Sequence, residues 1–208
     1  MKRAVALVAA ALACSVVSVH AQDTSMSFFV TSANPGKGGD LGGLAGADAY
    51  CAQLATAAGS TGKTWKAYLS TDAENAKDRI GNGPWYNAKG EKIADDVASL
   101  HSEKNNLTKQ TALNEKGEVI NGRGDTPNRH DMLTGSNPDG TAAADTCGNW
   151  TMGAAEGAAM VGHSDRTGLD ESAPAKSWNS SHKTRGGCTV EAFKSTGGDG
   201  LFYCFAAN

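Results

Sequence analysis

The chain has 208 residues, of which 19 are basic and 22 are acidic, giving a formal net charge of −3 at pH 7. This acidic balance disfavours nucleic acid, anionic lipid and heparin-like polyanions as partners, because all three require a basic face. The length suits a single domain, and 26 glycines with few aliphatic residues predict a loop-rich fold that benefits from covalent cross-links.

The N-terminal segment has the pattern of an export signal. Lys2 and Arg3 precede an apolar run over residues 4–13, and residues 19–21 resemble a small-residue cleavage site. The apolar run is too short to span a bilayer as a helix. We therefore predict that residues 1–21 are a signal peptide.

The predicted mature chain is one domain, residues 22–208, in a secreted or periplasmic protein. Its charge is −5, because the signal holds two basic residues and no acidic one. An alternative makes Cys14 the lipidated first residue of a lipoprotein. We disfavour this alternative because Ala11 stands where a lipoprotein box prefers leucine.

The mature domain contains an even number of cysteines: Cys51, Cys147, Cys188 and Cys204. Four cysteines in an exported chain predict two disulfides, for which three pairings are possible. None of them belongs to a Cys-x-x-Cys pair, so neither a cysteine zinc site nor thioredoxin-type chemistry is expected.

Hydrophobic periodicity predicts regular elements toward both ends of the domain. We expect a short strand over residues 27–31, a helix over residues 44–58 that buries Cys51, and a strand over residues 65–70. Residues 201–205 predict a further strand.

The middle of the chain gives weaker signals. Residues 75–80 predict one helical turn, and Ile93, Val97 and Leu100 fall on one face of a short helix. No long periodic run lies between residues 101 and 146. A long loop in a compact domain is usually functional or disordered, and the nearby Cys147 favours an ordered loop.

The order of motifs along the chain resembles a known fold family. The motifs are a helix with Cys51, the Trp-Lys-Ala-Tyr-Leu-Ser sequence at 65–70, the Gly-Ser-Asn-Pro-Asp-Gly sequence at 135–140, the Cys-Gly-Asn-Trp sequence at 147–150, Cys188, and a last strand with Tyr203 and Cys204. In this order they resemble the endostatin domain of collagens and, more closely, bacterial secreted proteins described as lectin-like, which share the C-type lectin-like fold.

The resemblance covers nearly all of the mature chain. It implies an α+β, C-type lectin-like (endostatin-like) fold with two helices, small antiparallel sheets, long disulfide-stapled loops and neighbouring termini. It also implies the nested pairs Cys51 with Cys204 and Cys147 with Cys188.

The calcium-dependent sugar site of C-type lectins has only altered counterparts in this chain. Those lectins use a Glu-Pro-Asn or Gln-Pro-Asp loop and a Trp-Asn-Asp strand to supply oxygen ligands. The nearest sequences here are Asn-Pro-Asp at 137–139 and Trp-Asn-Ser at 178–180, where Ser180 replaces a carboxylate.

The Asn-Pro-Asp-Gly sequence at 137–140 has the residues that a type I β-turn favours, so a structural turn is the preferred interpretation. The alternative hypothesis is that Asn137, Asp139 and Asp145 form an oxygen-rich ligand site. In that hypothesis Asp139 and Asp145 are calcium ligands.

Three histidines lie in polar segments together with serine and aspartate. The segments around His130, His163 and His182 contain the residue types of a Ser-His-Asp triad, but no Gly-x-Ser-x-Gly elbow is present. The three histidines could converge on zinc, but their spacing matches no familiar ligand set. We therefore interpret them as structural histidines.

Tryptophan can pack in the core or stack on a sugar. Trp65 and Trp150 fit the core pattern, because one alternates in a strand and the other follows a cysteine. Trp85 and Trp178 lie in polar loops and are the ligand candidates.

Taken together, these patterns predict an exported, non-enzymatic binding module whose ligand is a glycan or a protein surface. The candidate ligand residues are Asn137, Asp139, Asp145, Trp85, Trp178, Asn179 and His182. The alternatives are a structural envelope or matrix component that binds a protein partner and, less favoured, an exported hydrolase. Calcium is the one cofactor that the pattern suggests.

Overall fold

The computed structural model describes residues 26–208. The predicted signal peptide and the alternative lipidation site at Cys14 lie outside the described residues. Within residues 26–208, no helix combines the length and apolar character needed to cross a bilayer.

A six-stranded sheet is built around the C-terminal strand β8 (Gly198–Ala206). The C-terminal half of β8 pairs antiparallel with both β1 (Phe28–Val30) and β2 (Trp65–Ala67), one on each edge. Its N-terminal half pairs in parallel with β5 (Asp131–Leu133). The sheet continues from β5 to β6 (Met160–His163) and β7 (His182–Lys183), both antiparallel.

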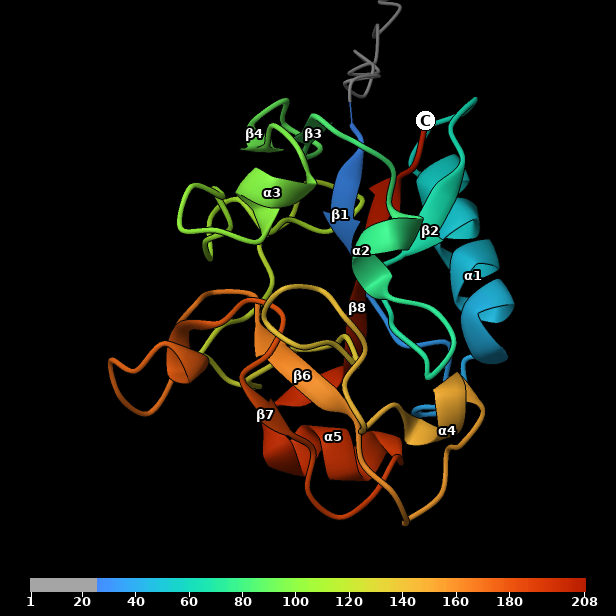
Figure 1. The fold of residues 1–208 in the computed structure, drawn as a ribbon, viewed down its shortest axis with the longest axis vertical. Helices are drawn as coiled ribbons and strands as arrows, with labels where there is room; N and C mark the ends of the chain where they lie inside the picture. Colours follow the sequence, from blue (N-terminus) through green and yellow to red (C-terminus); the bar gives the residue numbers. More distant parts are fainter. Residues whose placement is uncertain (1–25) are drawn as a thin grey trace, which may run out of the picture.

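Short helices and a small hairpin surround this sheet. The helices are α1 (Gly43–Ala57), α2 (Ala76–Arg79), α3 (Val97–Leu100), α4 (Cys147–Trp150), α5 (Val190–Thr196) and the 3-10 turn η1 (Pro174–Lys176). The hairpin consists of β3 (Trp85–Tyr86) and β4 (Lys92–Ala94). In Figure 1, α1, β1 and β2 surround the end of β8 near the C-terminus, whereas β6, β7 and α5 gather at its other end.

The predicted α+β class with small sheets is confirmed, with two corrections. The described residues contain five α-helices rather than two. Three of them, α2, α3 and α4, are single turns, and α5 has seven residues. The sheet is mixed rather than antiparallel, because β5 runs parallel to β8.

Both faces of β8 are buried, which divides the core in two. Phe202 and Cys204 point into one cluster, together with Cys51 of α1. Tyr203 and Phe205 point into the other, which also contains Tyr68, Trp85 and Trp178. A strand buried on both faces carries a continuous apolar sequence rather than an alternating one, as the sequence from Leu201 to Phe205 does.

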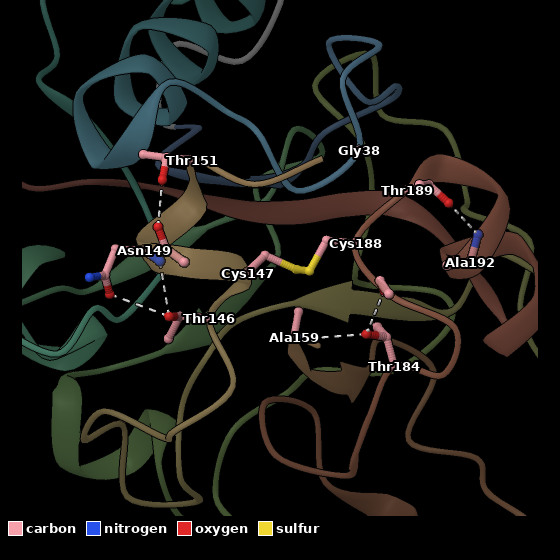
Figure 2. The surroundings of a disulfide bond; sticks show 12 residues. Gly38, Thr146, Cys147, Asn149, Thr151, Ala159, Thr184, Cys188, Thr189 and Ala192 are labelled. Atoms are coloured by element: carbon pink, nitrogen blue, oxygen red, sulfur yellow. Dashed lines mark hydrogen bonds between the residues drawn. A yellow bond between two sulfur atoms is a disulfide. The ribbon is translucent and has the colours of Figure 1, made fainter. Parts of the chain in front are cut away.

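The two disulfides join Cys51 to Cys204 and Cys147 to Cys188, which confirms the pairing implied by the resemblance. Such cross-links are typical of exported proteins. Figure 2 shows that the second bridge connects α4 to the segment that precedes α5. Thr189 caps α5 beside it by accepting a hydrogen bond from the Ala192 amide.

Candidate functional site

Three neighbouring strands bring histidine and aspartate side chains together. Asp131 begins β5 and is paired in register with His163 at the end of β6. His182 begins β7 opposite Val161, two residues before His163 on the same face of β6. His130 precedes β5, and its ring stacks on that of His163 with centroids 4.3 Å apart and an interplanar angle of 5°. The strand pairing therefore assembles four polar side chains that are distant in sequence.

Hydrogen bonds on the outer side of this cluster fix the orientation of the imidazoles. The Nδ1 atom of His130 lies 2.9 Å from an Asp165 carboxylate oxygen, and Nδ1 of His163 lies 2.7 Å from the Ala175 carbonyl. Nδ1 of His182 lies 3.3 Å from the Lys183 carbonyl. Because these oxygens can only accept, the Nδ1–H tautomer of each ring satisfies its outer contact and turns Nε2 toward the interior, where it can serve as a ligand atom.

The inward-facing Nε2 atoms surround one oxygen of Asp131. The Oδ1 atom lies 3.2 Å from Nε2 of His130, 3.4 Å from Nε2 of His163 and 3.8 Å from Nε2 of His182. The Nε2 atoms of His163 and His182 are 3.0 Å apart. Within residues 26–208, neither carboxylate oxygen of Asp131 makes a hydrogen bond, although the side chain is only 3% exposed. A buried carboxylate that accepts no hydrogen bond is costly, so this arrangement requires an explanation.

Burial disfavours the charged forms of Asp131 and His163. It raises the pKa of Asp131, although the nearby histidines act in the opposite direction. Burial also lowers the pKa of His163, outweighing its hydrogen bond to the Ala175 carbonyl. Desolvation opposes ionisation of Asp165 too, but hydrogen bonds from His130 and the Arg123 amide prevail and lower its pKa. A cation at the centre would stabilise the Asp131 carboxylate and the neutral imidazoles together.

These residues fit a divalent transition metal ion. Zinc bonds of about 2.0–2.1 Å to nitrogen place tetrahedral ligand atoms about 3.3 Å from one another. The four distances measured here, from 3.0 to 3.8 Å, scatter around that value. In residues 26–208, the one group of three such side chains close enough to share an ion consists of His130, Asp131 and His163. His182 borders this group, and its side chain is 41% exposed.

A surface cavity of about 410 Å³ opens over the cluster. This volume lies within the range of roughly 300–1,000 Å³ that is usual for small-molecule sites. The three histidines line the cavity together with polar side chains of Asn128, Ser181 and Thr196, and with the charged residues Arg123, Asp170, Lys183 and Arg185. An ion held by the cluster would therefore be accessible from solvent.

The same residues also approach the arrangement of a Ser-His-Asp triad. The Ser181 hydroxyl lies 3.4 Å from Nδ1 of His163, whose Nε2 faces Asp131. A general base must accept the serine proton at a free nitrogen lone pair. Nδ1 of His163 instead donates its own proton to the Ala175 carbonyl at 2.7 Å, so it cannot activate Ser181.

The turn at 137–140 is formed as predicted, with the Gly140 amide donating to the Asn137 carbonyl at 2.9 Å. Asp139 accepts hydrogen bonds from the amide and hydroxyl of Thr141, and these bonds lower its pKa. Asp139 and Asp145 belong to no group of three metal-ligating side chains among residues 26–208. The polar groups of this segment thus form hydrogen bonds largely within the turn.

Both tryptophans proposed as ligand residues are buried. Trp85 has no exposed surface and donates a hydrogen bond from Nε1 to the Ala206 carbonyl. Trp178 is 4% exposed and packs against Tyr68 and Tyr203. Neither indole offers a free face on which a sugar could stack.

The remaining candidates divide between two cavities. Asn179, Trp178 and Pro138 line a second, smaller cavity of about 200 Å³. The Asn179 amide is already occupied there, because it donates to the Tyr68 hydroxyl and to two carbonyls of the turn. His182 lies in the larger cavity instead. The structure therefore does not unite His182 with the turn and Trp178.

Sequence reasoning interpreted the three histidines as structural when taken as a group and named only His182 as a ligand candidate, and it assigned Asp131 and Asp165 no role in binding. Their separation along the chain matches no local metal motif. The available signal was that each histidine lies within three residues of an aspartate or a serine, which is too common to be specific. A comparison of the chain with models of known protein families finds no match, and neither does a comparison with curated protein sequences.

Proposed function

We propose that this chain is an exported binding domain that holds a divalent transition metal ion and binds its ligand at that ion. His130, Asp131 and His163 hold the ion, and His182 approaches it from the cavity side. The observation that carries the proposal is the buried Asp131 carboxylate, which has no hydrogen-bond donor in residues 26–208 and faces the Nε2 atoms of three histidines.

The ligand atoms favour a transition metal over calcium. Calcium takes six to eight oxygen ligands, whereas imidazole nitrogens suit zinc, copper, iron and nickel. The outer hydrogen bonds to the Asp165 carboxylate and the Ala175 carbonyl are the second layer that usually accompanies histidine ligands. Zinc is the natural first choice because an oxidising compartment does not change its valence.

The lectin-like resemblance supports a binding role but assigns a different ion. In this proposal the ligand meets the metal in the 410 Å³ cavity, and the turn at 137–140 has a structural role. A glycan remains a suitable ligand class, because hydroxyl and carboxylate oxygens can complete the coordination of an ion that the protein leaves open.

Metal binding by the purified, oxidised domain tests the proposal directly. Isothermal titration calorimetry should find one zinc ion per chain, and cobalt should give a visible absorption spectrum of low coordination number. Asp131→Asn should abolish both signals, because it removes the central anionic ligand. His101→Gln and Asp170→Asn are matched controls that change a histidine and an acid outside the ligand group, and both should bind zinc as the wild type does.

A second variant protects the test against misfolding of the buried Asp131→Asn protein. His182 is partly exposed, so His182→Ala should fold normally. Its affinity for zinc should nevertheless be lower than that of the wild type by a factor of about 10 or more. Absence of zinc and cobalt binding by the folded wild type would overturn the proposal. The cluster would then be an imidazolium–carboxylate pair with a purely structural role.

A further inference from the structure

The charges around the cavity differ from those of the whole protein. The chain is acidic, yet the cavity is lined by Arg123, Lys183 and Arg185 and by a single exposed acid, Asp170. Within residues 26–208, none of the three basic side chains has a carboxylate partner within ion-pair distance, whereas many other basic residues do. Three exposed cations without partners around one opening favour the binding of an anion.

The backbone holds these residues at the site. The Arg123 amide donates to Asp165, which also accepts from His130. Lys183 follows His182 in β7, and its carbonyl faces Nδ1 of that histidine. The Arg185 amide donates to the hydroxyl of Thr196, another residue of the cavity wall. The backbone of Lys183 thus contacts the proposed ligand His182 directly, whereas the backbone of Arg123 is connected to His130 through Asp165.

The ion itself adds to this preference. A divalent cation bound by one carboxylate and neutral imidazoles leaves a net positive centre at the base of the cavity. An oxygen anion can neutralise that centre and accept paired hydrogen bonds from the arginines. The neutral polar side chains of Asn128, Ser181 and Thr196 provide hydrogen-bond partners for hydroxyl groups on the same ligand.

We infer that the cavity binds a small oxyanion-bearing ligand, whose carboxylate or phosphate group contacts the ion at the Asp131 cluster and is held by Arg123, Lys183 and Arg185. This inference rests on the proposed function, because it needs the ion. It specifies the ligand class that the metal alone leaves open.

Three ligands that share a sugar ring but differ in charged group distinguish carboxylate binding from phosphate binding. Cobalt-loaded protein is titrated with glucose, glucuronate and glucose 6-phosphate, and the visible spectrum of the cobalt reports contact with the ion. Glucuronate or glucose 6-phosphate should change the spectrum, with saturation, whereas glucose should leave it unchanged. The tighter of the two anions identifies carboxylate or phosphate as the preferred group.

Variants assign the charge. Arg123→Ala and Arg185→Ala should bind cobalt as the wild type does but bind the anion at least about 10-fold more weakly, which is the range expected for charged contacts of this kind. Lys104→Ala removes an exposed basic residue that does not line the cavity and should behave like the wild type.

The outcomes distinguish the two proposals. Failure of cobalt to bind overturns the proposed function, and this inference falls with it. Normal cobalt binding with no anion effect on the spectrum, or an anion effect that both arginine variants retain in full, overturns this inference alone. A spectral change produced equally by glucose would also overturn it, because the charge would then play no part.

Discussion

Asp165 lies outside the proposed ligand group and makes its hydrogen bond to that group through His130. Its carboxylate is 4% exposed, accepts from Nδ1 of His130 at 2.9 Å and also accepts from the Arg123 amide. Such an outer carboxylate fixes the ring and increases the basicity of the ligating nitrogen. We expect Asp165→Asn to lower zinc affinity by about 10- to 100-fold while the domain stays folded.

Calorimetric titration of the Asp165→Asn protein measures this effect, with far-ultraviolet circular dichroism as the folding check. Asp170→Asn, on the cavity wall but outside the ligand group, is the matched control. Unchanged zinc affinity in the folded Asp165→Asn protein would mean that His130 is not a ligand.

His101 provides a pH-dependent contribution to stability away from the metal ligands. Its Nδ1 donates to the Val97 carbonyl and its Nε2 accepts from the Tyr68 hydroxyl, so the folded state holds the neutral ring. Burial lowers the pKa of His101 below 6.5, and Lys77 lowers it further, against opposing effects of the Val97 carbonyl and Asp139.

The sign of the effect follows from that direction. As the pH falls below 6.5, His101 becomes protonated in the unfolded chain while it stays neutral in the folded chain. The free energy of unfolding therefore decreases until the pKa of His101 in the folded chain is reached. Each unit of depression costs about 1.4 kcal/mol. The difference in unfolding free energy between the wild type and His101→Gln should therefore shrink from pH 8 to pH 5. Urea unfolding at each pH measures it, and a constant difference would contradict the prediction.

The site illustrates what residue types along a chain cannot disclose. The sequence presented His130, His163 and His182, but their convergence depends on pairing among β5, β6 and β7, strands of two to four residues whose register is set by non-local contacts. The indoles of Trp85 and Trp178 were misleading for a related reason. Their neighbours in sequence are polar, but the hairpin and the β6 to β7 connection bury them against the aromatic face of β8.

At the level of elements, the helices and strands that the sequence predicted correctly are those that are long and have a regular apolar pattern. The helix expected over residues 44–58 is α1, displaced by one residue, because its apolar spacing is regular over four turns. The strand expected over residues 65–70 is shorter, since β2 ends at Ala67 where pairing with β8 ceases. The seven-residue helix α5 was missed, because two buried residues, Ala192 and Phe193, give too little pattern.

The disulfide between α4 and the segment before α5 should contribute substantially to stability. It closes a span of 41 residues, for which chain entropy predicts about 4 kcal/mol. We expect Cys147→Ser/Cys188→Ser to lower the free energy of unfolding by about 2–4 kcal/mol, because a nested loop gains less than an isolated one. Urea unfolding measures the change.

The pair Cys51–Cys204 gives the comparison within the same chain. Its span of 153 residues is longer, whereas the cysteines of both pairs are buried in the same core cluster. Cys51→Ser/Cys204→Ser should therefore destabilise the domain more than the other double variant does. The opposite order would show that cavity and burial effects, rather than chain entropy, decide which double variant is less stable.

On the scale of the whole molecule, the structure has two cores on opposite faces of β8 and two cross-links, one between α1 and β8 and one between α4 and the segment before α5. The composition predicted the need for cross-links, since a chain rich in glycine cannot rely on one large aliphatic core. What the composition could not predict is a buried carboxylate with no donor in residues 26–208, because its cost becomes visible only when its neighbours are known.

That cost gives the metal a measurable effect on the stability of the entire domain. An ion that binds the folded chain at a free concentration of 100 times its Kd adds about 2.7 kcal/mol to the free energy of unfolding. For a domain of this size, each kcal/mol raises the melting temperature by about 2–4 °C, so zinc should raise it by roughly 5–10 °C. Calcium, which lacks affinity for imidazole nitrogen, should leave it unchanged.

Differential scanning calorimetry in zinc, in calcium and in chelator makes the comparison, with Asp131→Asn as the variant in which the zinc shift must vanish. A calcium shift retained by Asp131→Asn and lost in Asp139→Asn would place the stabilising ion at the turn over residues 137–140 instead. An equal zinc shift in the wild type and in Asp131→Asn would mean that zinc binds elsewhere on the surface. Only an increase in melting temperature that requires both zinc and Asp131 would show that an ion bound at the buried carboxylate stabilises the fold.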